Sequence, residues 1–137
     1  MRNGLRMTMI CDSHVLIFDA LAPYRLGHKA ADLPVQAEAR GDPACADVSR
    51  WEIAMMLNKD RLHVDADIRT FLRNVISARN IQVPPITVEI AELSQHLAFG
   101  HRDPAHRLIA ATAIHHRAPL LTSDERLHAI DALETLW

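Results

Sequence analysis

Four acidic residues that lie far apart in the sequence are the side chains best placed to do chemistry. Asp12 and Asp124 each follow a short apolar run that is typical of a buried strand. Glu52 lies in a helical pattern, and Asp103 begins another. In open α/β sheets, ligands bind at the carboxyl ends of the strands. Carboxylates gathered there repel one another unless a cation neutralises them, and Mg²⁺ and Mn²⁺ favour hard oxygen ligands. The four residues therefore predict metal-assisted chemistry on a phosphate group.

Each of these residues also has a structural interpretation. Asp12 could cap the helix that follows it, and Asp124 could be a turn residue after a strand. A solvent-facing side chain is the default for Glu52, although the apolar face of its helix should include Trp51. Asp103 precedes a proline, and Asp-Pro is a strong helix start that explains the residue completely. Only the joint placement of all four favours a site.

The elements that position these residues alternate between short apolar runs and longer amphipathic stretches. Strands are predicted at 8–12, 44–48, 81–83, 119–122 and 132–137, and helices at 14–21, 26–39, 49–57, 67–79, 87–97 and from 103 onward. Ser49 is the predicted N-cap of the third helix. The last helix is apolar on nearly all sides, so Leu108 and Ile109 should be buried.

Strands that alternate with helices imply right-handed crossovers and a mostly parallel sheet that is covered on both faces. The expected fold is therefore α/β, with a central, mostly parallel sheet flanked by helices. It should form one domain over residues 8–137, after a dispensable N-terminal tail at 1–7.

Composition excludes several classes of protein. The chain has 137 residues, which suits one domain, and its formal charge of −2 disfavours binding nucleic acid through a broad basic surface. Two Trp, one Tyr and three Phe are too few for a base-stacking platform. No apolar stretch approaches the roughly 20 residues that span a bilayer, and we expect no signal peptide. Cys11 and Cys45 fall in predicted strands, where buried free thiols of a cytoplasmic protein are favoured over a disulfide.

The nine histidines do not form a recognisable zinc motif. The chain has no Cys-x-x-Cys and no His-Glu-x-x-His pattern, and the adjacent His115 and His116 must point to different sides of a helix. Its four glycines form neither a phosphate-binding loop nor the turn that holds a catalytic serine. We therefore expect no structural zinc site, nucleotide-binding loop or serine hydrolase.

Taken in order, the motifs resemble PIN-domain proteins of the VapC toxin type, which belong to type II toxin–antitoxin systems. The resembling segments are 10–14, 48–54, 58–62, 103–113, 121–127 and 136–137. The resemblance implies an Mg²⁺- or Mn²⁺-dependent endoribonuclease that cleaves cellular RNA and is silenced by a cognate antitoxin. A homodimer is expected on the same basis. Family roles transfer by motif to Asp12, Glu52 and Asp124.

One position departs from the family pattern. Relatives of this type usually have a second Asp, normally counted in the metal cluster, where this chain has His106. Asp103 lies three residues earlier on the same helix face, so Asp103 or His106 would have to complete the cluster. Imidazole is a poor ligand for Mg²⁺ and adds no negative charge, so we expect weaker Mg²⁺ binding and attenuated activity.

The resulting site model assigns a role to each residue. Asp12 and Asp124 are expected to bind the metal directly or through water, together with Asp103 or His106. Glu52 is expected to orient or deprotonate the attacking water, and the metal to stabilise charge on the phosphate. Ser123 could hydrogen-bond a ligand carboxylate, and Arg107 could contact a phosphate, although a surface arginine fits as well.

Two hypotheses of other classes compete with the nuclease. With His106 in place of a carboxylate, the chain could fold and bind an antitoxin while cutting RNA poorly or not at all. A receiver-type phosphoacceptor domain is also α/β with an Asp after a strand, but it gives no role to the helix around Trp51 and Glu52 or to the Asp103-Pro104 helix start.

Overall fold

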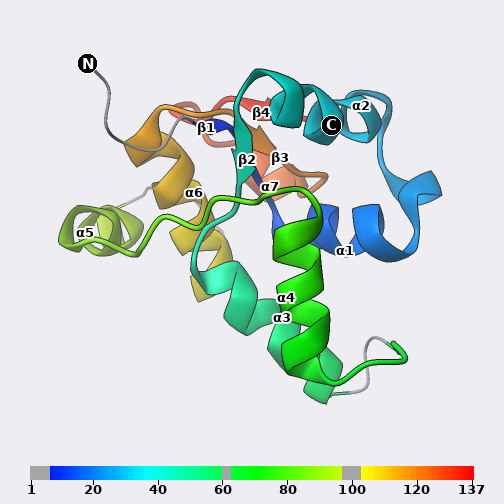
Figure 1. Ribbon diagram of the computed structural model, residues 1–137. Coiled ribbons are helices and arrows are strands. Elements are labelled where there is room, and N and C mark those ends of the chain that lie inside the picture. The colour runs from blue at the N-terminus through cyan, green and yellow to red at the C-terminus, as the bar shows by residue number, and fades with distance from the viewer. Residues whose placement is uncertain (1–6, 60–62, 97–102) are drawn as a thin grey trace.

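A four-stranded parallel sheet forms the centre of the protein (Figure 1). The computed structural model describes residues 7–59, 63–96 and 103–137. The strands are β1 (Met7–Cys11), β2 (Asp42–Ala44), β3 (Leu120–Leu121) and β4 (Thr135–Leu136), in the order β2-β1-β3-β4. All three strand pairs are parallel, which confirms the predicted sheet.

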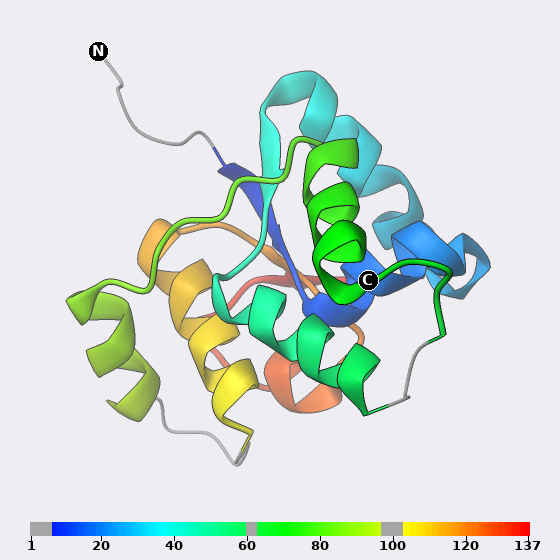
Figure 2. The same cartoon turned by 60° about the horizontal axis from the view of Figure 1, so that its bottom comes forward.

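Helices cover both faces of the sheet, as predicted (Figures 1 and 2). They are α1 (Ser13–Leu21), the 3₁₀ turn η1 (Pro23–Arg25), α2 (His28–Arg40), α3 (Val48–Asn58), α4 (Ile68–Ala78), α5 (Val88–His96), α6 (Pro104–His116) and α7 (Glu125–His128). Side chains that alternate along β1 enter two separate cores. Met9 and Cys11 pack with residues of α1 to α4, whereas Ile10 packs with residues of α6 and α7.

The second strand lies earlier in the chain than predicted. It ends at Ala44, whereas the prediction placed it at 44–48. The chain turns at once, because the Ser49 N–H bonds to the Ala46 carbonyl, 2.9 Å away. Asp47 therefore occupies the N-cap position of α3 in place of Ser49. The strand predicted at 81–83 is reduced to a single bridge between Ala44 and Gln82.

Both cysteines are buried free thiols, as predicted, although Cys45 follows β2 instead of lying in it. Burial raises the pKa of the Cys45 thiol to about 12, so it stays protonated at neutral pH. Burial likewise raises the pKa of Cys11 far above its usual range. Neither thiol is a candidate nucleophile.

The predicted boundaries of the domain fall partly outside the described residues. Met7 already pairs with Asp42, so the sheet starts one residue before the predicted domain. Residues 1–6 of the predicted tail, and position 97 at the predicted end of α5, lie outside the described residues. None of the described helices is long and apolar enough to cross a membrane.

Helix α6 crosses the middle of the second core, as its composition predicted. Ile109 is 0% exposed, but Leu108 is only half-buried, which corrects that part of the prediction. The two residues are separated by about 100° around the helix, so Leu108 lies at the border of the buried face. α5 packs along α6 on the outside.

We predict that Ile109→Asp unfolds the protein, because this substitution buries a charge that has no partner. The matched control is His115→Asp on the exposed part of the same helix, which should leave the midpoint of thermal unfolding nearly unchanged. Circular dichroism melts of both variants provide the measurement. A soluble Ile109→Asp protein that melts cooperatively near the wild-type temperature would contradict the central position of α6.

Candidate metal centre

The parallel register of β1 and β3 brings Asp12 to the end of the neighbouring strand. Cys11 pairs with Leu121, and the N–H of Asp12 donates to the Leu121 carbonyl at 3.0 Å. The Thr122 hydroxyl then donates to Asp12 Oδ2 at 2.7 Å. Asp12 occupies the N-cap position of α1, but its side chain makes no capping hydrogen bond. Its carboxylate is therefore held by Thr122 and not by the helix that it begins.

Two further aspartates enter the same region from helix starts. Asp103 is the N-cap of α6, and its Oδ1 accepts the N–H of Ala105 at 2.9 Å. Asp124 is the N-cap of α7, and its Oδ1 accepts two N–H groups of the first turn, at 2.8 and 3.2 Å. The capping interpretation is thus correct for Asp103, and Asp124, interpreted as a turn residue, also caps a helix. It uses only one oxygen of each carboxylate.

The remaining oxygen of each aspartate lies beside one side chain, His106 on α6. His106 Nδ1 is 3.2 Å from Asp103 Oδ2 and 3.8 Å from Asp124 Oδ2. Its Nε2 is 3.8 Å from Asp12 Oδ1. His106 is 8% exposed and Asp12 is 3% exposed, so the contact between these two is largely withdrawn from water, whereas Asp103 and Asp124 stay partly exposed. His106 therefore lies in the middle of the aspartates.

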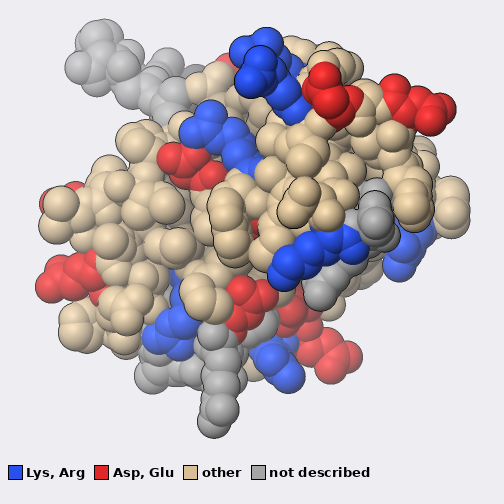
Figure 3. All heavy atoms as spheres, turned by 90° about the horizontal axis from the view of Figure 1, so that it is seen from below, with Lys and Arg blue, Asp and Glu red and all other residues tan. Residues whose placement is uncertain are grey.

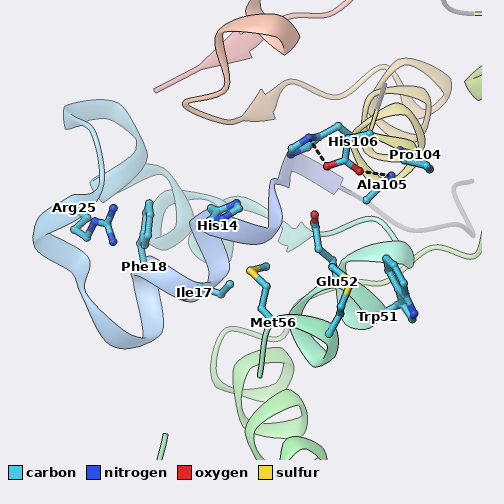
Figure 4. Close-up of a pocket in the computed structure, with 12 residues that line it drawn as sticks. His14, Ile17, Phe18, Arg25, Trp51, Glu52, Met56, Pro104, Ala105 and His106 are labelled. Atoms are coloured by element: carbon cyan, nitrogen blue, oxygen red, sulfur yellow. Dashed lines mark hydrogen bonds and ion pairs between the residues drawn. The ribbon is translucent and has the colours of Figure 1, made fainter. Parts of the chain in front are cut away.

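Glu52 reaches the cluster from the opposite side. It is 6% exposed, which excludes the solvent-facing interpretation, and Figure 4 shows it extending from α3 toward His106. One turn earlier, Ser49 accepts a buried hydrogen bond from Ser13 at 2.8 Å, which joins α3 to the start of α1. Ser49 is therefore not the cap that we predicted but a link that fixes the position of Glu52.

The donor atoms fit a divalent cation. Glu52, Asp103 and His106 each offer a ligand atom, and these atoms lie within 4.8 Å of one another. Within the described residues, Asp12 Oδ1 and Glu52 Oε1 are buried without a hydrogen-bond partner. Buried carboxylate oxygens without donors are costly unless a cation compensates them. The first turns of α1 and α6 add positive dipole ends, which favour negative charge nearby.

A cavity of about 470 Å³ opens beside the cluster, within the size range of ligand-binding pockets. Glu52, Asp103 and His106 line one side of it. Phe18 lies on the opposite side with Arg25, whose guanidinium is 4.3 Å from the centre of the Phe18 ring (Figure 4). Glu52 and Asp103 are thus accessible to a ligand.

Ser123 and Arg107, which were predicted to assist the site, do not make the predicted contacts. The hydroxyl that holds Asp12 belongs to Thr122, whereas Ser123 is exposed. Arg107 Nε donates to the Ser94 carbonyl at 2.8 Å, so this guanidinium ties α6 to α5 and is not directed at a phosphate. The sequence does contain a clue to the role of Thr122. Thr122 directly follows β3, just as Asp12 directly follows the paired strand β1.

Trp51 is also placed differently from the prediction. It is 59% exposed and not part of a buried apolar face. The reason is helical geometry: Glu52 and Ile53 take the buried side of α3, so the residue before them faces outward. Trp51 lines the outer part of the cavity.

One face of the molecule agrees with the nearly neutral composition. In Figure 3, basic and acidic side chains of the described residues are interspersed with large uncharged areas and form no continuous basic surface on the face shown.

Comparisons with known proteins agree with the resemblance seen in the motifs. A family model described as PIN domain matches residues 9–133. The chain is 31% identical over 133 residues to Ribonuclease VapC22 of Mycobacterium tuberculosis, across 95% of this chain and 98% of that protein. The chain belongs to the PIN domain family. This confirms the predicted family and its VapC-type resemblance.

Solved structures support the same fold for this PIN domain. VapBC2 from Rickettsia felis, bound to a DNA fragment from its promoter, aligns with a TM-score of 0.71 at 13% identity, across 95% of this chain and 98% of that one. A toxin–antitoxin complex from Klebsiella pneumoniae aligns with a TM-score of 0.60 at 19% identity, across 94% and 96%. At such identities the likeness concerns the fold alone.

We predict that Thr122→Val lowers the free energy of unfolding by about 1–3 kcal/mol, since it leaves a buried Asp12 oxygen without its donor. Ser123→Ala is the matched control and should change this free energy by less than about 0.5 kcal/mol. Denaturant titrations of both variants, without divalent ions, make the comparison. Equal losses in the two variants would show that the Thr122 hydrogen bond does not hold Asp12.

Proposed function

We propose that this chain is a divalent-metal-dependent endoribonuclease toxin of the VapC type. The observation behind the proposal is the arrangement around His106, where oxygens of Asp12, Asp103 and Asp124 lie within 3.8 Å of its ring nitrogens. Glu52 adds a buried carboxylate from α3. The similarity to Ribonuclease VapC22 supports RNA as the substrate.

The residues around the ion have two tasks, holding it and handling water. Asp12, Asp103 and Asp124 would hold Mg²⁺ or Mn²⁺, with His106 between them. The ion would supply positive charge against the phosphate and make a nearby water more acidic. Glu52, whose Oε1 has no hydrogen-bond partner among the described residues, would offer one carboxylate oxygen to the ion and with the other orient that water and accept its proton. The cavity beside the cluster would admit the RNA strand.

The partner follows from the relatives. The Klebsiella pneumoniae structure with the same fold is a toxin–antitoxin complex, which supports a cognate antitoxin protein as the partner of this chain in the cytoplasm. A homodimer stays a prediction. Arg25, at the far side of the cavity, is better placed than Arg107 to contact a flanking phosphate.

The alternative function is an antitoxin-binding PIN module that cuts RNA weakly or not at all. The central place of His106 favours this alternative, because an imidazole contributes no negative charge where relatives of this type have a carboxylate. The fold and the partner would be the same. Only the catalytic rate separates the two.

We predict that the purified protein cleaves labelled single-stranded RNA with Mg²⁺ or Mn²⁺ and that EDTA stops the reaction. Asp12→Asn should abolish cleavage, because it removes a charge from the cluster while keeping an acceptor for Thr122. Asp131→Asn, on an exposed carboxylate away from the cluster, should cleave at the wild-type rate. If Asp12→Asn cuts RNA as fast as wild type, with the same metal dependence, the assignment of the cluster is wrong.

We predict that His106→Asp raises Mg²⁺-supported cleavage by about tenfold or more, which corresponds to about 1.4 kcal/mol of barrier. The reason is that the substitution restores a fourth carboxylate among Asp12, Asp103 and Asp124. Initial rates at matched Mg²⁺ concentrations measure the effect. An unchanged rate would mean that Asp103 already completes the cluster and that His106 does not limit catalysis.

A further inference from the structure

We propose that His106 is a metal ligand that makes this site select divalent transition ions, such as Mn²⁺ and Co²⁺, over Mg²⁺. The inference rests on the proposed metal site and concerns the identity of the ion. Its closing experiment measures binding, so it can succeed or fail independently of RNA cleavage.

The imidazole of His106 lies among the atoms that could bind the ion, so it can bind the ion directly instead of only supporting other ligands. Ligand atoms of Glu52, Asp103 and His106 lie within 4.8 Å of one another, a spacing that a single ion can span. Asp103 and His106 are three residues apart in the first turn of α6, so both face the cluster. Glu52 closes the group from α3 (Figure 4). The three donors are two oxygens and one nitrogen.

Two further carboxylates supply charge around this group. Asp12 Oδ1 and Asp124 Oδ2 are each 3.8 Å from a nitrogen of His106. Asp12 is 3% exposed, and this oxygen has no hydrogen-bond partner among the described residues. It is therefore available to the ion directly or through water. The site has enough negative charge for a divalent cation even though one donor is neutral.

The donor types decide between ions. Mg²⁺ demands near-ideal octahedral geometry, dehydrates reluctantly and is bound through oxygen. Imidazole suits transition ions, whose affinity for a mixed nitrogen and oxygen site rises from Mn²⁺ to Co²⁺ and Ni²⁺. A buried imidazole at this position therefore weakens Mg²⁺ binding more than Mn²⁺ binding. His106 is a determinant of metal selectivity.

The test compares metal binding by wild type, His106→Asp and His106→Asn, with His115→Asn as the control on an exposed histidine of the same helix. Calorimetric titration gives the affinities for Mg²⁺, Mn²⁺ and Co²⁺. Pulsed electron paramagnetic resonance of the Mn²⁺ complex detects nitrogen modulation from a coordinated imidazole. Circular dichroism establishes that each variant is folded, and His106→Asn removes the imidazole without adding a negative charge if the aspartate variant does not fold.

We expect wild type and His115→Asn to bind Mn²⁺ at least about tenfold more tightly than Mg²⁺ and to show nitrogen modulation. His106→Asp should lose the modulation and bind Mg²⁺ more tightly, and His106→Asn should lose the modulation and bind both ions weakly. Equal wild-type affinities for Mg²⁺ and Mn²⁺, or a modulation that persists in both His106 variants, would overturn the inference. So would a wild-type Mn²⁺ complex without modulation, or no binding of Mn²⁺ at all.

Cleavage of RNA is scored separately on the same samples. Mn²⁺ bound through His106 without any RNA cleavage would leave the selectivity standing and remove the proposed nuclease function. RNA cleavage supported equally by Mg²⁺ and Mn²⁺, without nitrogen modulation, would keep the nuclease and remove His106 as a ligand.

Discussion

Electrostatic repulsion among Asp12, Glu52, Asp103 and Asp124 is the constraint on which the site depends. An N-cap contributes about 1 kcal/mol. Carboxylate oxygens of Glu52 and Asp103 lie within 4.8 Å of each other, and two like charges at that distance repel by about 3 kcal/mol at an effective dielectric constant of about 20. Several such pairs outweigh the gain from capping, so helix starts alone do not explain why carboxylates converge here. A cation bound among the carboxylates replaces this repulsion by attraction. His106 lies next to the position that such a cation would occupy.

The fold imposes this convergence through backbone geometry. Parallel pairing of β1 with β3 aligns the ends of the strands, so Asp12 and Thr122 meet there. The capping bonds of Asp103 and Asp124 fix one oxygen of each carboxylate and thereby the direction of the other. The buried α6 holds Asp103 and His106 in place. The charged cluster is a consequence of how strands end and helices begin in this sheet.

The parallel sheet, the main helices and the family followed from periodicity and motifs, because apolar patterning reports which face of an element is buried. The partners of individual side chains did not follow from the sequence. Ser49 looked like an N-cap, but its hydroxyl accepts from Ser13, a partner 36 residues away that no local pattern reveals. Thr122 and Ser123 are chemically alike, and only the register of β3 tells which one faces Asp12. For Asp103, capping and clustering were treated as rivals, whereas the residue does both with different oxygens, and Asp124 behaves in the same way.

His106 places a nitrogen donor among the carboxylates of this PIN domain, and the position of the ion is the most direct test of the account. Anomalous diffraction from crystals soaked in Mn²⁺ would locate it. The account predicts one strong peak within bonding distance of His106, Asp103 and Glu52, with Asp12 in the same coordination sphere or one water away. A peak bound only by Asp12 and Asp124, with the imidazole turned away, or no peak at the cluster, would contradict it.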